Sequence, residues 1–191
     1  MCFFLLLASL LACGNNKAKE ESTSQALREV PGADSIAYYP VQQYFKSQVA
    51  DVAATPYYVY EIIQRNGMRD SSKVSPEHFR HLANNFLEVN IEEMPLKKYY
   101  QENSFSDLSL KSVTFTYTAL KSDLPLKSLD VLLDETGTRV TRVFMHKEYG
   151  NKDSTVMEKL GWMHDESFYI NRMVEYANGN TVTEHRTVKW R

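Results

Sequence analysis

The order of hydrophobic and polar residues changes character several times along this chain of 191 residues. Between Pro40 and Pro56, large apolar residues recur at helical spacing and form one stripe: Val41, Tyr44, Phe45, Val49 and Val52. Pro40 suits the first turn of a helix, so we expect a helix here that ends at Pro56. Residues 57–64, YYVYEIIQ, are rich in β-branched and aromatic side chains and predict a strand. Asn66-Gly67 predicts a hairpin turn, with a short return strand from Met68 to Val74.

A second helix is predicted by the start signal Ser75-Pro76-Glu77, which combines a hydroxyl cap, an early proline and an acidic first turn. Its apolar residues follow the pattern i, i+3, i+4, i+7, i+8: Phe79, Leu82, Ala83, Phe86 and Leu87. Pro95 marks its outer limit, and residues 95–109 are expected to be irregular or briefly helical.

From Lys111 onward the period changes to two, as in SVTFTYTA. Further alternating segments include Leu129-x-Val131-x-Leu133 and the ranges 139–147, 154–163 and 167–176, and the last one ends at Trp190. Short turns separate them, which predicts an antiparallel meander of about six strands.

One face of such a sheet is covered and the other is wet. The expected fold class is therefore α+β: two amphipathic helices packed on an antiparallel β-meander of about six strands, plus an N-terminal β-hairpin, in a single domain over residues 35–191. We expect the stripe of Phe79, Leu82 and Phe86 to meet the first meander strand at Val113, Phe115 and Tyr117.

The start of the chain, MCFFLLLASLLA, is almost wholly apolar. As a helix it would be about 18 Å long, too short for a hydrocarbon core of ~30 Å. A buried terminal strand or helix is one interpretation, and a secretory signal with a small residue before its cleavage point is the other. Leu10-Leu11-Ala12-Cys13 resembles the lipobox of bacterial lipoproteins. The resemblance implies a signal peptide over residues 1–12 and a lipid attached to Cys13.

Residues 13–34 are polar and read as a lipidated cysteine followed by a flexible tether. The charged run at residues 17–21 is either a solvated part of this tether or, as in some lipoproteins of the Bacteroidota, a signal for the cell surface. The order of elements, with Val188-Lys189-Trp190 at the end, also resembles Bacteroidota lipoproteins to which no activity is assigned. The implied location is the cell envelope, on the outer membrane at its periplasmic side or at the cell surface.

The net charge of −2 arises from 22 basic and 24 acidic residues that are well mixed. Because no basic stripe occurs, nucleic acid is not expected as a partner. No polybasic cluster appears in the sequence, so membrane attachment is expected to rest on the lipid. Cys2 and Cys13 are the only cysteines, which leaves no pair for a disulfide in the mature domain.

Motifs for catalysis or cofactor binding are missing from the sequence: there is no phosphate-binding loop, Gly-x-Ser-x-Gly, Cys-x-x-Cys or His-Glu-x-x-His. Glu77, His78 and His81 share one helical turn, but two histidines alone would not hold zinc, and surface positions explain them. His164-Asp165-Glu166 falls where the meander needs a polar turn. His146 and His185 lie within strands and have no partner that spacing identifies. We therefore expect no catalytic residue, no metal and no cofactor.

The 12 tyrosines suit half-buried strands, and as a group they are compatible with a binding surface. The function expected is that of a lipid-anchored envelope protein whose non-enzymatic domain binds or scaffolds a protein or small molecule. The alternative is a carrier of lipids or lipoproteins with a cavity between sheet and helices. An enzyme ranks third among these possibilities, because no set of acid, base and nucleophile can be assembled from the motifs.

Overall fold

The computed structural model describes residues 38–93 and 95–191. The signal peptide, Cys13 and the tether predicted for residues 1–34 lie outside the described residues. The elements are, in order, α1 (Val41–Ala54), β1 (Val59–Arg65), β2 (Met68–Lys73), α2 (Pro76–Ala83), the 3-10 turns η1 (Asn84–Phe86) and η2 (Lys97–Tyr99), β3 (Tyr100–Asp107), β4 (Ser112–Ala119), β5 (Leu126–Leu133), β6 (Val140–Gly150), β7 (Ser154–Met163), β8 (Ser167–Tyr176) and β9 (Thr181–Trp190).

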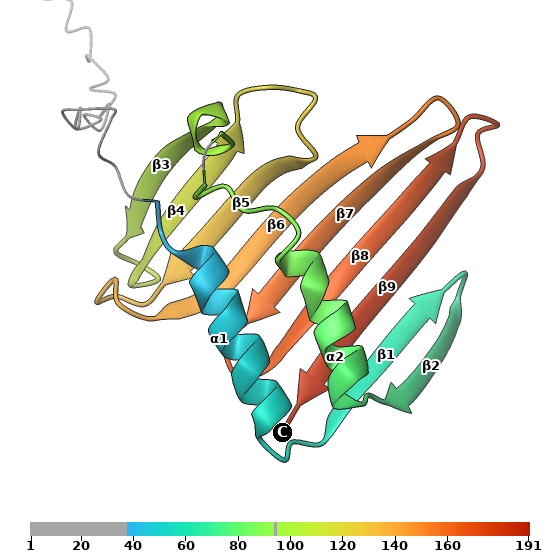
Figure 1. The fold of residues 1–191 in the computed structure, drawn as a ribbon, viewed down its shortest axis with the longest axis horizontal. Coiled ribbons are helices and arrows are strands. Elements are labelled where there is room, and N and C mark those ends of the chain that lie inside the picture. Colours follow the sequence, from blue (N-terminus) through green and yellow to red (C-terminus); the bar gives the residue numbers. More distant parts are fainter. Residues whose placement is uncertain (1–37, 94) are drawn as a thin grey trace, which may run out of the picture. The chain divides into compact units, whose positions relative to one another are not determined.

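All nine strands form one antiparallel sheet in the order β2-β1-β9-β8-β7-β6-β5-β4-β3, with both α-helices on one face (Figure 1). The α+β class and the antiparallel sheet are confirmed, but the expected six-strand meander is wrong. Residues 95–109 are expected to be irregular or briefly helical, and the brief helix is η2. The rest of that range is not irregular: β3 is a strand although its sequence, YQENSFSD, does not alternate between apolar and polar residues. It forms a strand as the edge of the sheet, where it pairs with β4 alone.

The β1–β2 hairpin belongs to the same sheet, because β1 pairs with β9 along its whole length. Its turn places Asn66 at φ 49° and Gly67 at φ 80°. Two consecutive positive φ angles are the requirement of the tight hairpin turn that Asn-Gly favours. The strand pairing therefore brings residues near the start of the domain beside its last strand.

The start of α2 is capped as its sequence indicates: the Ser75 side chain accepts a hydrogen bond from the His78 backbone N–H. The α-helix ends at Ala83, earlier than the limit at Pro95, and continues as the 3-10 turn η1. Phe86 is nevertheless fully buried, so the apolar stripe of the helix extends through η1.

Six aromatic rings fill the space between the helices and the centre of the sheet: Phe45, Phe79, Phe86, Trp162, Phe168 and Trp190. Phe86 lies edge-on to Trp162 and Phe168, with ring centroids 5.1 and 5.4 Å apart. Phe79 contacts Phe168 and Trp190. The ring contacts of the α2 stripe are thus with β7, β8 and β9, and not with β4 as expected.

β4 is covered by the segment that leads into α1. The ring of Tyr38 packs on Tyr117 at 4.8 Å, and the ring of Tyr39 stacks on Phe115 at 6.3 Å. The Tyr39 backbone N–H donates to the Tyr117 hydroxyl at 2.8 Å. The sheet is therefore covered in two parts, by the helices over β7–β9 and by residues 38–39 over β4. Within residues 38–93 and 95–191, no helix has the length and apolar character needed to cross a membrane.

Candidate functional site

The face of the sheet opposite the helices carries the most distinct hollow of the described domain. Side chains alternate between faces along a strand, so the neighbours of the buried Leu160, Ile170 and Trp162 point away from the helices. A hollow of about 640 Å³ lies there across β1, β9, β8 and β7. We refer to this surface as the open face.

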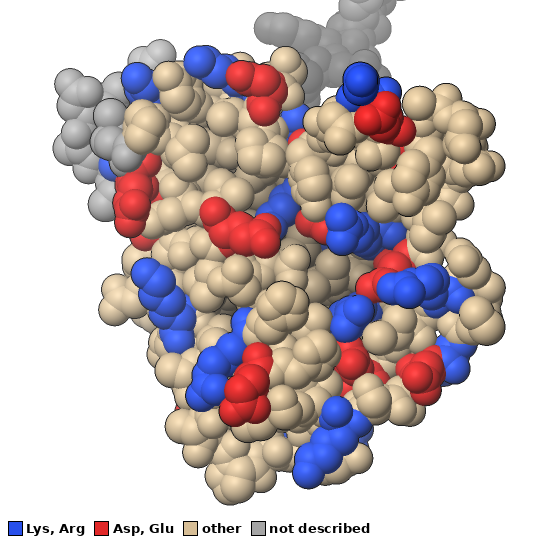
Figure 2. All heavy atoms as spheres, turned by 45° about the vertical axis from the view of Figure 1, so that its right-hand side comes forward, with Lys and Arg blue, Asp and Glu red and all other residues tan. Residues whose placement is uncertain are grey.

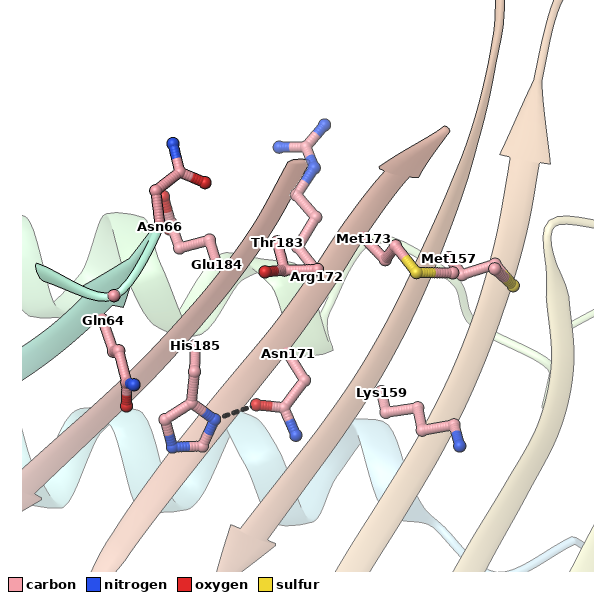
Figure 3. A pocket seen from close by; sticks show the side chains of 11 residues that line it. Gln64, Asn66, Met157, Lys159, Asn171, Arg172, Met173, Thr183, Glu184 and His185 are labelled. Carbon is pink, nitrogen blue, oxygen red and sulfur yellow. Dashed lines mark hydrogen bonds between the residues drawn. The ribbon is translucent and has the colours of Figure 1, made fainter. Parts of the chain in front are cut away.

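The walls of the hollow combine amides, an imidazole, an ammonium group and two thioethers (Figure 3). The side chains that belong to the open face are Gln64, Met157, Lys159, Asn171, Met173, Thr183 and His185. Met157 and Met173 are directly opposed on β7 and β8, and Asn171 and His185 on β8 and β9. Such a mixture of apolar surface with a few polar groups is typical of binding sites for small molecules or extended segments.

His185 is held by hydrogen bonds at both ring nitrogens. Its Nδ1 contacts Asn171 Oδ1, and its Nε2 lies 3.1 Å from the Thr187 hydroxyl. The amide oxygen of Asn171 can only accept, so Nδ1 carries a proton and donates. In the neutral ring Nε2 then accepts from Thr187, which fixes the orientation of the imidazole.

The ring of Tyr169 lies flat on the strand backbone at Gly161. A Cβ atom at Gly161 would come within 2.3 Å of this ring, so the glycine provides its space. Tyr169 also stacks on His185, with centroids 6.4 Å apart and planes at 24°. Burial raises the pKa of the Tyr169 phenol, which therefore stays neutral and can donate a hydrogen bond at physiological pH.

Two further hollows adjoin the first on the open face. One of about 470 Å³ includes Tyr169, His185, Arg69 and Glu166. The other, of about 200 Å³, includes Tyr169, Lys159 and His146. Tyr169, His185 and Lys159 are each shared between two hollows, so they form a central ridge that an extended ligand would contact on both sides.

The helix-covered face carries charge where the helices end. Arg65, Glu184, Arg172, Glu158 and Lys147 lie directly opposite one another on β1, β9, β8, β7 and β6, and their signs alternate. We call this set the charged row. Arg65 pairs with Glu184, and Arg172 with Glu158 at 3.5 Å. In the view of Figure 2, basic and acidic side chains are interspersed and neither sign forms a large continuous area.

Two buried charges of this face have partners that stabilise them. Lys147, 2 % exposed, donates to the Asn85 carbonyl at 2.5 Å and to Glu88 at 2.9 Å. Glu61 accepts from Arg186 at 2.6 Å and from the Ser72 hydroxyl at 3.1 Å. Since these groups satisfy one another, they explain without a ligand how β6 is joined to residues 85–88 and how β1 is joined to β2 and β9.

The histidines considered from the sequence lie at different places. His78 Nε2 is 3.4 Å from Glu61, and its ring stacks on His81 at 6.4 Å. His164 lies in the β7–β8 turn, where Nδ1 is 3.3 Å from the Tyr44 hydroxyl and Nε2 is 3.1 Å from Asp165. Burial, followed by the charge of Asp165, raises the pKa of Tyr44. Among residues 38–93 and 95–191, no three His, Cys, Asp or Glu side chains are placed to share a metal ion.

Spacing in the sequence identifies no partner for His146 or His185, and both residues lie on the open face. The residues that accompany them, Asn171, Tyr169 and Lys159, were not identified from the sequence. Alternation assigns all five to one face once the strand register is known, but no local motif marks them. Comparisons with protein-family models, with curated proteins and with solved structures find no match for this chain.

Proposed function

We propose that this protein is a lipid-anchored protein of the bacterial cell envelope, attached through Cys13, whose domain is a non-enzymatic binding module that uses the open face of its sheet. The hollow of about 640 Å³ across four strands carries this proposal. Its polar groups are held in place by hydrogen bonds and stacking, as at His185, so the surface is largely formed before a ligand arrives.

The chemistry of the hollow favours a ligand with both an apolar part and hydrogen-bonding groups. Met157 and Met173 supply apolar contact, while Gln64, Thr183 and Lys159 supply hydrogen bonds. The Tyr169 ring adds apolar contact from the two adjoining hollows. The Thr187 hydroxyl donates to His185 Nε2, but Thr187 does not line this hollow, and the proposal is therefore binding and not catalysis.

The carrier alternative places its ligand between the sheet and the helices. A hollow of about 440 Å³ lies where the end of α1 meets β1 and the start of α2, beside Val59 and Phe79. The six aromatic rings of the core occupy the centre of the space under α1 and α2. Their close edge-on contacts support a structural role for this region and make the open face the better candidate.

The proposal is tested by photo-crosslinking in living cells. A benzophenone amino acid replaces Thr183, an exposed residue in the hollow, or Lys46, an exposed residue on α1 as the matched control. We expect adducts of defined mass from position 183 and none from position 46. Met173→Trp should fill the hollow and abolish these adducts. Equal labelling from both positions would contradict the proposed binding face.

The anchor is tested separately. Metabolic labelling with a fatty-acid analogue should label the wild-type chain but not Cys13→Ala, which should also leave the membrane fraction. If Cys13→Ala keeps the label, the proposed anchoring site is wrong whatever the crosslinking shows.

A further inference from the structure

The β3–β4 turn carries the most exposed large apolar side chains of the described residues. Leu108 is 89 % exposed and Leu110 is 76 % exposed, and Phe105 on the adjoining strand is 58 % exposed. Single exposed apolar residues are common on protein surfaces, but several at one protruding turn indicate a contact with an apolar partner.

Hydrogen bonds hold this turn in one conformation. Asp107 Oδ1 accepts from the Ser109 backbone N–H at 2.8 Å, from the Ser109 hydroxyl at 2.6 Å and from the Leu110 N–H at 3.0 Å. The Ser109 hydroxyl and the Leu110 and Ser109 N–H groups lower the pKa of Asp107, so it stays ionised and keeps accepting. The two leucines are thus presented to the outside by a formed turn.

One of the two acidic groups beside the leucines is paired with a lysine. Lys111 follows Leu110 and lies 3.5 Å from Glu135 in the neighbouring β5–β6 turn. The Asp107 carboxylate accepts hydrogen bonds from the backbone N–H groups of its own turn. Asp107 keeps its negative charge because its hydrogen-bond donors are neutral groups. The tip therefore combines two exposed leucines with one net negative charge, and Lys111 beside them can reach the polar layer of a membrane.

The chain enters the domain on the same hairpin. Tyr39 stacks on Phe115 and donates its N–H to Tyr117, both on β4, the strand that follows the leucine turn. At ~3.3–3.6 Å per extended residue, the stretch from Cys13 to Tyr39 is long enough to let this hairpin reach a bilayer that holds the anchor. The described chain therefore enters at the end of the hairpin formed by Tyr100 and Tyr117, and the leucine turn is its other end.

We propose that the β3–β4 turn inserts Leu108 and Leu110 into the acyl-chain layer of the bilayer that holds the lipid anchor. The inference rests on the proposed anchoring at Cys13. A lipid chain and an inserted apolar tip together hold a protein on a membrane more firmly than either alone. Two attachments at separate places in the chain also limit how the domain can rotate against the membrane.

The experiment uses the full-length protein, produced with its anchor and reconstituted into phosphatidylcholine vesicles. Lipidation blocks the thiol of Cys13, and the signal peptide with Cys2 is removed, so an introduced cysteine is the only site for a thiol-reactive, environment-sensitive fluorophore. Leu108→Cys places the probe at the tip. Met68→Cys, at a residue 74 % exposed beside the β1–β2 turn, is the control.

We expect blue-shifted emission from position 108, and quenching by acyl-chain nitroxides several-fold stronger than at position 68. Water-like emission at both positions would overturn the proposal. A shift at position 108 in native envelope membranes but not in pure lipid vesicles would also overturn it, in favour of a protein partner.

A failure of the anchor gives a different result, because the wild-type chain would then itself react with the fluorophore at Cys13. In that case the anchoring proposal is wrong. The same two probe positions are then compared in a Cys13→Ser chain added to preformed vesicles, and equal water-like emission there overturns tip insertion independently.

Discussion

The two faces of the sheet use the same strands for opposite purposes. On β7 and β8, Trp162 and Phe168 point toward the helices and are fully buried, whereas Met157 and Asn171 on the same strands line the open hollow. The covered face obtains its stability from close packing. The open face has surface contacts alone, and its side chains are ordered by stacking and hydrogen bonds. A substitution on the covered face should therefore lower the free energy of unfolding much more than a matched substitution at an exposed position.

The largest effect is expected from Phe86→Ala. Its ring contacts Phe45, Trp162 and Phe168, so the truncation leaves a cavity in the aromatic core and should lower the free energy of unfolding by about 3–5 kcal/mol. Phe105→Ala is the matched control at an exposed position and should change it by less than about 1 kcal/mol. Urea denaturation measures both, and equal costs would contradict the difference between core and surface.

The next largest effect is expected from Lys147→Met. The change keeps an unbranched side chain but removes the Nζ atom, which is the donor to the Asn85 carbonyl and the partner of Glu88. The loss of this donor at a part-buried carbonyl should cost about 1–3 kcal/mol. Lys111→Met, at an exposed pair with Glu135, should stay within about 0.5 kcal/mol. If Lys147→Met proves neutral, the contact between β6 and η1 does not contribute to stability.

A smaller effect is expected at Glu184. Burial alone would raise the pKa of its carboxyl, but Arg65 and Arg186 outweigh it and the pKa is lowered. A lowered pKa means that the stabilisation is present above the unfolded value of about 4.3 and is lost as the pH falls through the folded value. Thermal unfolding of wild type and Glu184→Gln should differ by up to about 1 kcal/mol at pH 7, and the difference should vanish in acid. A stability difference between the two proteins that grows as the pH falls would show that the pKa of Glu184 is raised and not lowered.

The smallest effect on stability is expected from Gly161→Ala on the open face. The added Cβ displaces the outer end of the Tyr169 ring, which can swing into solvent, so the cost should be about 1 kcal/mol or less. The displacement should nevertheless abolish the stacking on His185, visible as a changed chemical shift of the imidazole protons. In a Tyr169→Ala background the same change should cost nothing. A large loss of stability would show that the open face is packed as tightly as the core.

The sequence predicted best the elements whose signals are local. Ser75-Pro76-Glu77 marks the start of α2, and the alternation of Val113, Phe115 and Tyr117 marks β4. β3 was missed because polar residues occupy both of its faces, and pairing with β4 makes it a strand. The open face could not be assembled from sequence, since Asn171 and His185 become neighbours through the register of β8 and β9. The residues of the α2 stripe, through Phe86, were predicted correctly. The strands that they contact could not be predicted, because these depend on where the helix crosses the sheet.

The charged row has a consequence for how the strands find one another during folding. A shift of β9 against β8 by two residues keeps every apolar side chain on its own face, so hydrophobicity alone does not prevent it. Such a shift would place Arg172 opposite Arg186 in one direction and opposite Val182 in the other, in place of Glu184. The first arrangement opposes two positive charges, and the second separates a charge pair. The row of alternating signs therefore adds a cost to misaligned pairings that the separation of apolar and polar faces alone does not impose.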